Sequence, residues 1–193
     1  MFRKREGIII FRMNCLDMKF SFLDNLALYV LEGQPTPILP DIAMQGLEDD
    51  YDSESLILIA GCPSNENPFV IDVHFKSLLK ELGLHLAEKS QAALFLIKSI
   101  RKKIVDNEID PYEGCDLIFK EVVGSVKITP DKIYAHDGIG LAQVYGMYDN
   151  IRDLMEATGR WDTEKTNEEL IEEVKERIRL CFIAYEFPDR LGQ

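Results

Sequence analysis

Cysteine is scarce in this sequence, and its spacing excludes the common cysteine-based sites. The chain holds four cysteines, Cys15, Cys62, Cys115 and Cys181, and no two of them lie close together in sequence. Structural zinc sites and thioredoxin-type redox sites need close pairs such as C-x-x-C, so neither is expected. The residues around the four cysteines are small or apolar, which predicts reduced and mostly buried thiols.

Histidine is also rare, which limits the metal sites that the chain can build. The three histidines are His74, His85 and His136, and none lies within four residues of another. Zinc hydrolases usually carry histidine pairs at helical spacing, as in H-E-x-x-H. We therefore predict no metal and no cofactor. One alternative stays open, in which His74, His136 and Asp137 converge across helices with acidic neighbours to hold a metal or a small ligand.

Long apolar runs are missing. No stretch approaches the roughly 18 apolar residues that a membrane span requires. Residues 1–12 hold four basic residues against one acidic residue, but their apolar run 8-IIIF-11 is too short for the core of a secretory signal. We therefore expect an intracellular, cytoplasmic protein that does not bind a membrane.

Basic residues are fewer than acidic residues in this chain. The chain has 22 Lys and Arg against 34 Asp and Glu, a net charge of −12 at pH 7. A field of this sign repels nucleic acid and anionic lipid, and it favours solubility or a basic partner. The basic cluster 98-KSIRKK-103 fits the polar face of a helix better than a phosphate-binding surface. We predict no nucleic-acid binding.

Several motifs of catalysis and ion binding are incomplete. The chain has no G-x-S-x-G motif, and 138-GIG-140 lacks the further glycine of a dinucleotide-binding loop. A calcium loop of the EF-hand kind requires glycine at position 6 and glutamate at position 12. A loop starting at Asp50 has Ser55 and Gly61 there, and residues 106–117 fail in the same way. Cys62 has no basic residue close in sequence that would lower its pKa and make it nucleophilic.

Helical periodicity is abundant. Thr166 and Glu169 form a capping box before apolar residues spaced by three and four, which predicts a helix. Three further helix starts are predicted where a capping side chain is followed by proline, at Asn67-Pro68, Asp110-Pro111 and Thr129-Pro130. The remaining patterns predict helices over 17–32, 68–82, 88–106, 117–123 and 139–157, a helix for 56–60, and an extended segment at 7–12.

Short connections between these helices predict an all-α fold, a compact irregular bundle of about seven or eight helices. A short extended N-terminal segment could accompany it. We expect one domain over residues 1–193, and residues 1–12 could be a peripheral N-terminal extension of it.

The densest chemical signal is the acidic stretch 47-LEDDYDSES-55. With the acidic residues of 168–176 and the lack of a complete catalytic motif, it favours a non-catalytic protein that masks a basic partner protein, as an immunity protein or antitoxin does. Tyrosines on the helix over 139–157 add potential interface anchors. The predicted partner-binding residues are Glu48, Asp49, Asp50, Tyr51, Asp52, Tyr145 and Tyr148.

Two other functions remain open from the sequence. One is a helical enzyme or ligand-binding protein built on the site of histidine and acidic residues described above. The other is a structural or homo-oligomeric helical protein without a separate ligand. The acidic stretch has an alternative interpretation as well, since it could be only the polar gap between two helices, with Asp52 or Ser53 as the cap of the second helix.

Overall fold

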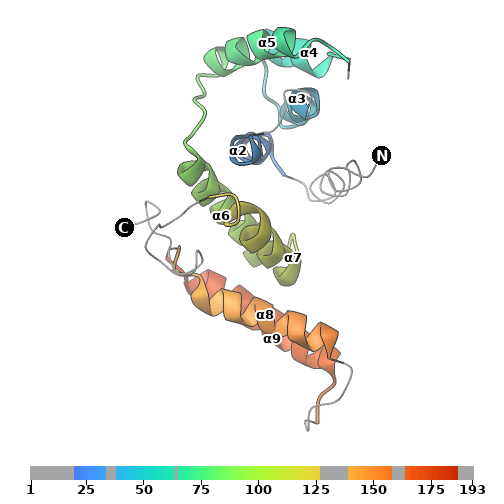
Figure 1. Ribbon diagram of the computed structural model, residues 1–193, viewed down its shortest axis with the longest axis vertical. Helices are drawn as coiled ribbons and strands as arrows, with labels where there is room; N and C mark the ends of the chain where they lie inside the picture. Colours follow the sequence, from blue (N-terminus) through green and yellow to red (C-terminus); the bar gives the residue numbers. More distant parts are fainter. Residues whose placement is uncertain (1–19, 34–37, 64, 127–138, 158–163, 187–193) are drawn as a thin grey trace, which may run out of the picture. The chain divides into compact units, whose positions relative to one another are not determined.

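The computed structural model describes residues 20–33, 38–63, 65–126, 139–157 and 164–186. Every regular element within these ranges is a helix, and they comprise eight α-helices and one π-helical segment (Figure 1). This confirms the predicted all-α fold class and the predicted number of helices. The extended segment expected at 7–12 lies outside the described residues.

The chain divides into two compact units, Met1–Ala87 and Glu88–Gln193, which we describe separately. The first contains α2 (Phe22–Glu32), α3 (Leu39–Glu48), α4 (Glu54–Ala60) and α5 (Pro68–Glu81). The second contains α6 (Lys89–Val105), α7 (Pro111–Asp116), the π-helix η2 (Leu117–Val122), α8 (Ala142–Glu156) and α9 (Asn167–Ala184). A single domain over 1–193 stays a prediction.

Three helices, α5, α7 and α9, begin at the residues that local capping rules predict, whereas the helix predicted over 17–32 begins at Phe22. The Thr166 hydroxyl accepts a hydrogen bond from the Glu169 N–H, and the Glu169 carboxylate accepts one from the Thr166 N–H, so the predicted capping box of α9 is present. Asn67 caps α5 and Asp110 caps α7, each followed by proline at the first helical position. The start expected at 129–130 lies outside the described residues. Side chains that satisfy the first N–H groups of a helix stabilise it, which is why these signals are reliable.

Helix α3 is not among the predicted elements. Pro40 lies in its first turn, where proline is tolerated, and Gly46 lies in its last turn. A Cβ atom at Gly46 would come within 3.0 Å of the Leu56 and Phe22 side chains. Glycine is therefore needed there for close packing of α3 against α4 and α2.

The first unit has one hydrophobic core to which all four of its described helices contribute. Helix α4 packs against both α3 and α5, and α3 packs against α2. The buried side chains of this core are Phe22, Leu26, Leu39, Ile42, Ala43, Leu56, Ile59, Ile71, Phe75 and Leu78. Leu56 and Ile59 confirm that the apolar run 56–60 is a helix, with its inner face turned to this core.

In the second unit, α6 and α9 contact each other, and each binds the last turn of the other. The Arg101 Nε donates to the Phe182 carbonyl (2.6 Å), and the Arg179 Nε donates to the Ile104 carbonyl (3.3 Å). Cations near a helix C-terminus satisfy its unpaired carbonyls and interact favourably with its dipole. Arg101 of the basic cluster is thus used inside the unit.

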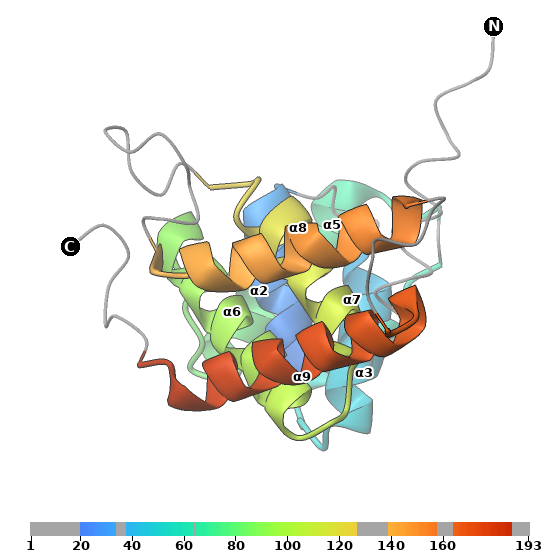
Figure 2. The same ribbon diagram turned by 90° about the horizontal axis from the view of Figure 1, so that it is seen from below.

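Helices α8 and α9 lie side by side, as both views show (Figures 1 and 2). The Asn167 side-chain amide, at the start of α9, donates to the Leu154 carbonyl near the end of α8 (3.1 Å). The helix predicted over 117–123 is present but is π-helical, with the Val123 N–H bonded to the Ile118 carbonyl (2.8 Å). Among the described helices, none has the length and hydropathy of a membrane span.

Candidate functional site

The predicted acidic site is the link between two packed helices. We call residues 48–54 the acidic connection: Glu48 ends α3, residues 49–53 form the turn, and Glu54 begins α4. Of the two caps considered for α4, the structure selects Ser53, whose hydroxyl accepts from the Leu56 N–H (3.0 Å). The connection is therefore held at both ends by helices that share the core of the first unit.

Asp49 has a structural role within this connection. One of its carboxylate oxygens accepts from the Phe22 N–H (2.5 Å), and the other accepts from the Gln45 side-chain amide (2.9 Å). The first of these bonds satisfies a backbone donor at the start of α2 that has no partner within its helix. Tyr51 is half-buried, and its ring packs against that of Phe22 with centroids 4.8 Å apart. Both residues tie the connection to α2.

The other four acidic residues of the connection point to solvent. Glu48, Asp50, Asp52 and Glu54 are exposed, and no described residue forms a hydrogen bond or an ion pair with their carboxylates. Asp50 has a φ of 63°, the left-handed region that Asp and Asn tolerate better than most residues. The result is four uncompensated negative charges within seven residues.

A feature of the sequence explains why these charges are uncompensated. Residues 20–75 contain ten Asp and Glu and no Lys or Arg. The net charge of the whole chain hides this, because basic residues are plentiful in other segments. The long interval without Lys or Arg is therefore a clearer sequence signal for the acidic connection than the local density of its carboxylates.

Glu81, at the end of α5, fixes the start of α4. Its carboxylate accepts from both the Ser53 and Ser55 hydroxyls (2.7 and 2.6 Å) and from the Ser55 N–H (3.1 Å). These hydrogen bonds, chiefly the one from the Ser55 hydroxyl, lower the pKa of Glu81. They favour the charged form, so Glu81 stays ionised and anchored at neutral pH.

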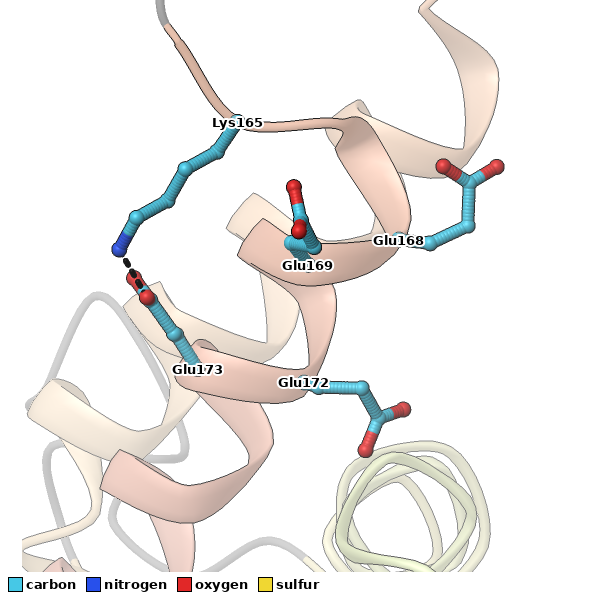
Figure 3. Close-up of a pocket in the computed structure, with 5 residues that line it drawn as sticks. All are labelled: Lys165, Glu168, Glu169, Glu172 and Glu173. Atoms are coloured by element: carbon cyan, nitrogen blue, oxygen red, sulfur yellow. Dashed lines mark hydrogen bonds and ion pairs between the residues drawn. The ribbon is translucent and has the colours of Figure 1, made fainter.

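The second acidic segment, on α9, differs because it provides its own cations. Lys165, Glu168, Glu169, Glu172 and Glu173 line a shallow, open depression along the first turns of the helix (Figure 3). Lys165 pairs with Glu173, Lys175 with Glu172 and Arg179 with Glu176. Lys175 also pairs with Asp110 of the α7 cap (2.9 Å). Most of the negative charge on this face is locally compensated, although Glu168 points away from the Lys165–Glu173 pair (Figure 3).

Of the two predicted tyrosines, Tyr148 belongs to the interior of the second unit and Tyr145 is partly exposed. Tyr148 is 2% exposed and donates its hydroxyl to Asp116 (2.5 Å), while its ring stacks on Tyr112 at 5.3 Å. Tyr145 is half-buried and packs edge-on against Phe119 at 5.1 Å. Burial, followed by the bond to Asp116, raises the pKa of Tyr148. As placed, Tyr148 has no surface to offer a partner.

Only one of the three residues named for the alternative metal site lies within the described residues. His74 is half-buried on α5, whereas His136 and Asp137 lie outside the described residues. Within the described ranges, no group of three or more His, Cys, Asp or Glu side chains is arranged to hold a metal ion. No observation therefore brings the predicted ligands together.

Cys62 and Cys115 do not resemble nucleophiles. Burial and the nearby Glu66 raise the pKa of Cys62, and burial above all raises that of Cys115. A catalytic thiolate needs the opposite shift. Cys62 and Cys181 are half-buried, Cys115 is buried, and all three are free thiols.

Comparison of the chain with protein-family models, with curated proteins and with solved structures finds no match. Side-chain geometry and charge are therefore the features that indicate a function. Of the residues predicted to bind a partner, Glu48, Asp50 and Asp52 present exposed carboxylates, and Glu54 joins them.

Proposed function

We propose that the protein is a non-catalytic binding protein, and that its acidic connection receives a cationic surface of another protein. One observation carries this proposal: Glu48, Asp50, Asp52 and Glu54 are exposed and have no cation among the described residues. On α9, by contrast, lysines and an arginine of the same chain already pair with the carboxylates. A cation of another protein could therefore pair with the carboxylates of the connection without breaking an ion pair among the described residues.

The packing around the connection supports a binding role. Asp49 and Ser53 fix its backbone through hydrogen bonds, and Glu81 holds the start of α4. A surface that is already ordered loses less conformational entropy on association. Clustered charges of one sign also speed the encounter with a partner of opposite charge and favour that partner over others.

Masking a basic protein is the role that this arrangement suits best. An acidic surface of this kind can cover the cationic active or binding surface of its partner, as an immunity protein or antitoxin does, and the cytoplasm is the compartment in which we expect it. The predicted complex depends on ionic strength, because exposed charges are screened over about 10 Å at 0.1 M salt.

The test uses three versions of the full chain as bait for basic proteins in a low-salt lysate of the native cell. The first is wild type. The second, the connection variant, carries Glu48→Gln, Asp50→Asn, Asp52→Asn and Glu54→Gln. The third, the α9 variant, carries Glu168→Gln, Glu172→Gln, Glu173→Gln and Glu176→Gln. Both variants lose the same charge, from −12 to −8. Asn suits the left-handed backbone at position 50.

We expect one basic protein, in near-equal amount, to elute with wild type and with the α9 variant and to be lost from the connection variant. Circular dichroism and thermal unfolding confirm that each bait is folded. Loss of the protein from the α9 variant alone, equal retention by all three baits, or the absence of any stoichiometric basic protein would contradict the proposal.

A further inference from the structure

Helix α4 carries exposed apolar side chains next to an unpaired carboxylate. Ile57 and Leu58 are 55% and 45% exposed, while Leu56 and Ile59 are buried in the core. Glu54 lies three and four residues before the exposed pair, so it shares the outer face of the helix with them. The outer face of α4 is thus both acidic and apolar.

Helix α3 has the same combination. Met44 is 49% exposed and lies four residues before Glu48, which places both on one face. Helices α3 and α4 pack against each other and are joined by the acidic connection. Each of these two neighbouring helices therefore carries exposed apolar surface about one turn from an unpaired carboxylate.

We infer that the partner segment bound here is a cationic amphipathic helix, with Lys or Arg beside large apolar residues at helical spacing. This inference rests on the proposed function and specifies its partner. The cations of the partner would complement four carboxylates that no described residue pairs with, those of Glu48, Asp50, Asp52 and Glu54. Apolar side chains of the partner cover Met44, Ile57 and Leu58, since removing such surface from water is favourable. Recognition of this kind places one helix along the surface of another protein.

The exposed apolar residues of α5 and α9 differ, because the carboxylates beside them are already paired. On α5, Phe69 and Val73 are exposed, but the nearest carboxylate on that helix, Asp72, is paired with Lys76 (2.7 Å). On α9, Leu180 and Ile183 are 53% and 54% exposed, and the neighbouring Glu176 is paired with Arg179. The α9 pair therefore serves as a matched control for Ile57 and Leu58.

The experiment uses two synthetic peptides of about 14 residues made of Lys and Leu. In the first, the two residue types segregate to opposite faces of a helix; in the second, the same composition is scrambled so that they do not. Fluorescence anisotropy measures their binding to four full-length proteins. These are wild type, the connection variant, Ile57→Ser/Leu58→Ser and the control Leu180→Ser/Ile183→Ser.

We expect wild type and the control to bind the amphipathic peptide about tenfold more tightly than does Ile57→Ser/Leu58→Ser. The salt dependence of binding should stay the same in that variant, because its charges are intact. Wild type should bind the scrambled peptide about tenfold more weakly than the amphipathic one. The connection variant should bind both peptides weakly, with a reduced salt dependence.

The possible failures are distinguishable. If Ile57→Ser/Leu58→Ser binds as wild type does and the two peptides are equivalent, the amphipathic inference is overturned. The proposed function then survives as long as the connection variant still binds weakly. If the connection variant binds both peptides as tightly as wild type does, the inference and the proposed function fail together.

Discussion

Adjacent aspartates of the acidic connection have opposite roles. Asp49 accepts hydrogen bonds from the Phe22 N–H and from Gln45, whereas Asp50 faces solvent. We expect Asp49→Asn to lower the free energy of unfolding by about 1–2 kcal/mol, because asparagine keeps only one acceptor oxygen and one of the two donors is left without an acceptor. Asp50→Asn should change it by less than about 0.5 kcal/mol. Urea titrations of the two variants measure the difference, and equal effects would contradict this assignment.

Glu81 makes stability depend on pH. Its pKa is lowered in the folded protein, so the ionised carboxylate stabilises the fold above the unfolded value of about 4.3. This stabilisation is lost as pH falls through the folded pKa, since protonation weakens the bonds to Ser53 and Ser55. We expect Glu81→Gln to lower the thermal midpoint at neutral pH, and we expect the gap from wild type to close in acid.

Thermal unfolding of wild type and Glu81→Gln from about pH 7 to about pH 3 measures that gap. The control is Glu66→Gln, which lies outside this hydrogen-bonded group and should follow wild type. A constant gap across the whole range would show that the glutamine acts through packing and not through the lost charge.

Local patterns predict some of these residue roles and miss others. Ser53 was one of two predicted caps because serine and aspartate share the geometry that accepts from the second or third N–H of a helix. The bond from Phe22 to Asp49 joins residues 27 positions apart, so no local spacing could indicate it. For the same reason the sequence pattern places Asp49 among the partner-binding residues. It places Tyr148 there as well, although the ring and hydroxyl of Tyr148 have partners inside the second unit.

At the scale of elements, helices with a capping signal and an apolar stripe were predicted, and α3 was not. Its proline and glycine normally signal turns. In the structure, Pro40 occupies the tolerated first turn and Gly46 allows Phe22 and Leu56 to approach closely. The π-helical hydrogen bonding of η2 has no sequence signature of its own, so only its helical character could be expected.

Substitution of two helical glycines by alanine should change the stability of the protein in opposite directions. At Gly114 in α7, a Cβ atom would lie 2.6 Å from the Ile104 side chain, so Gly114→Ala should destabilise the protein by about 1–3 kcal/mol through overpacking. At Gly146 in α8, no atom outside the adjacent residues and the backbone of α8 itself lies within 4 Å of the added carbon. Gly146→Ala should therefore stabilise the protein by about 0.5–1 kcal/mol, because alanine is the better helix former.

Chemical denaturation of these two variants tests the helix contacts directly. Both sites lie in the second unit and both substitutions add one methyl group, which makes each the control for the other. A stabilised Gly114→Ala protein would mean that α7 and α6 do not approach each other as described.

At the scale of the whole molecule, the distribution of charge matters more than its total. The sequence predicts an acidic protein, and the acidic residues of 47–55 and 168–176 both support a basic partner. Ion pairs compensate the α9 segment, whereas residues 20–75 contain no Lys or Arg to compensate the acidic connection. Pairing between side chains depends on the fold, so the sequence pattern could not separate the two segments.

The most direct test of this account is the association rate of the captured basic partner, measured by stopped flow over a range of salt concentrations. We expect the connection variant to associate about tenfold more slowly than wild type at low salt, with a flatter salt dependence. The α9 variant, with the same net charge, should follow wild type closely. If the two variants slow association equally, net charge and not the acidic connection drives the encounter, and the central claim is wrong.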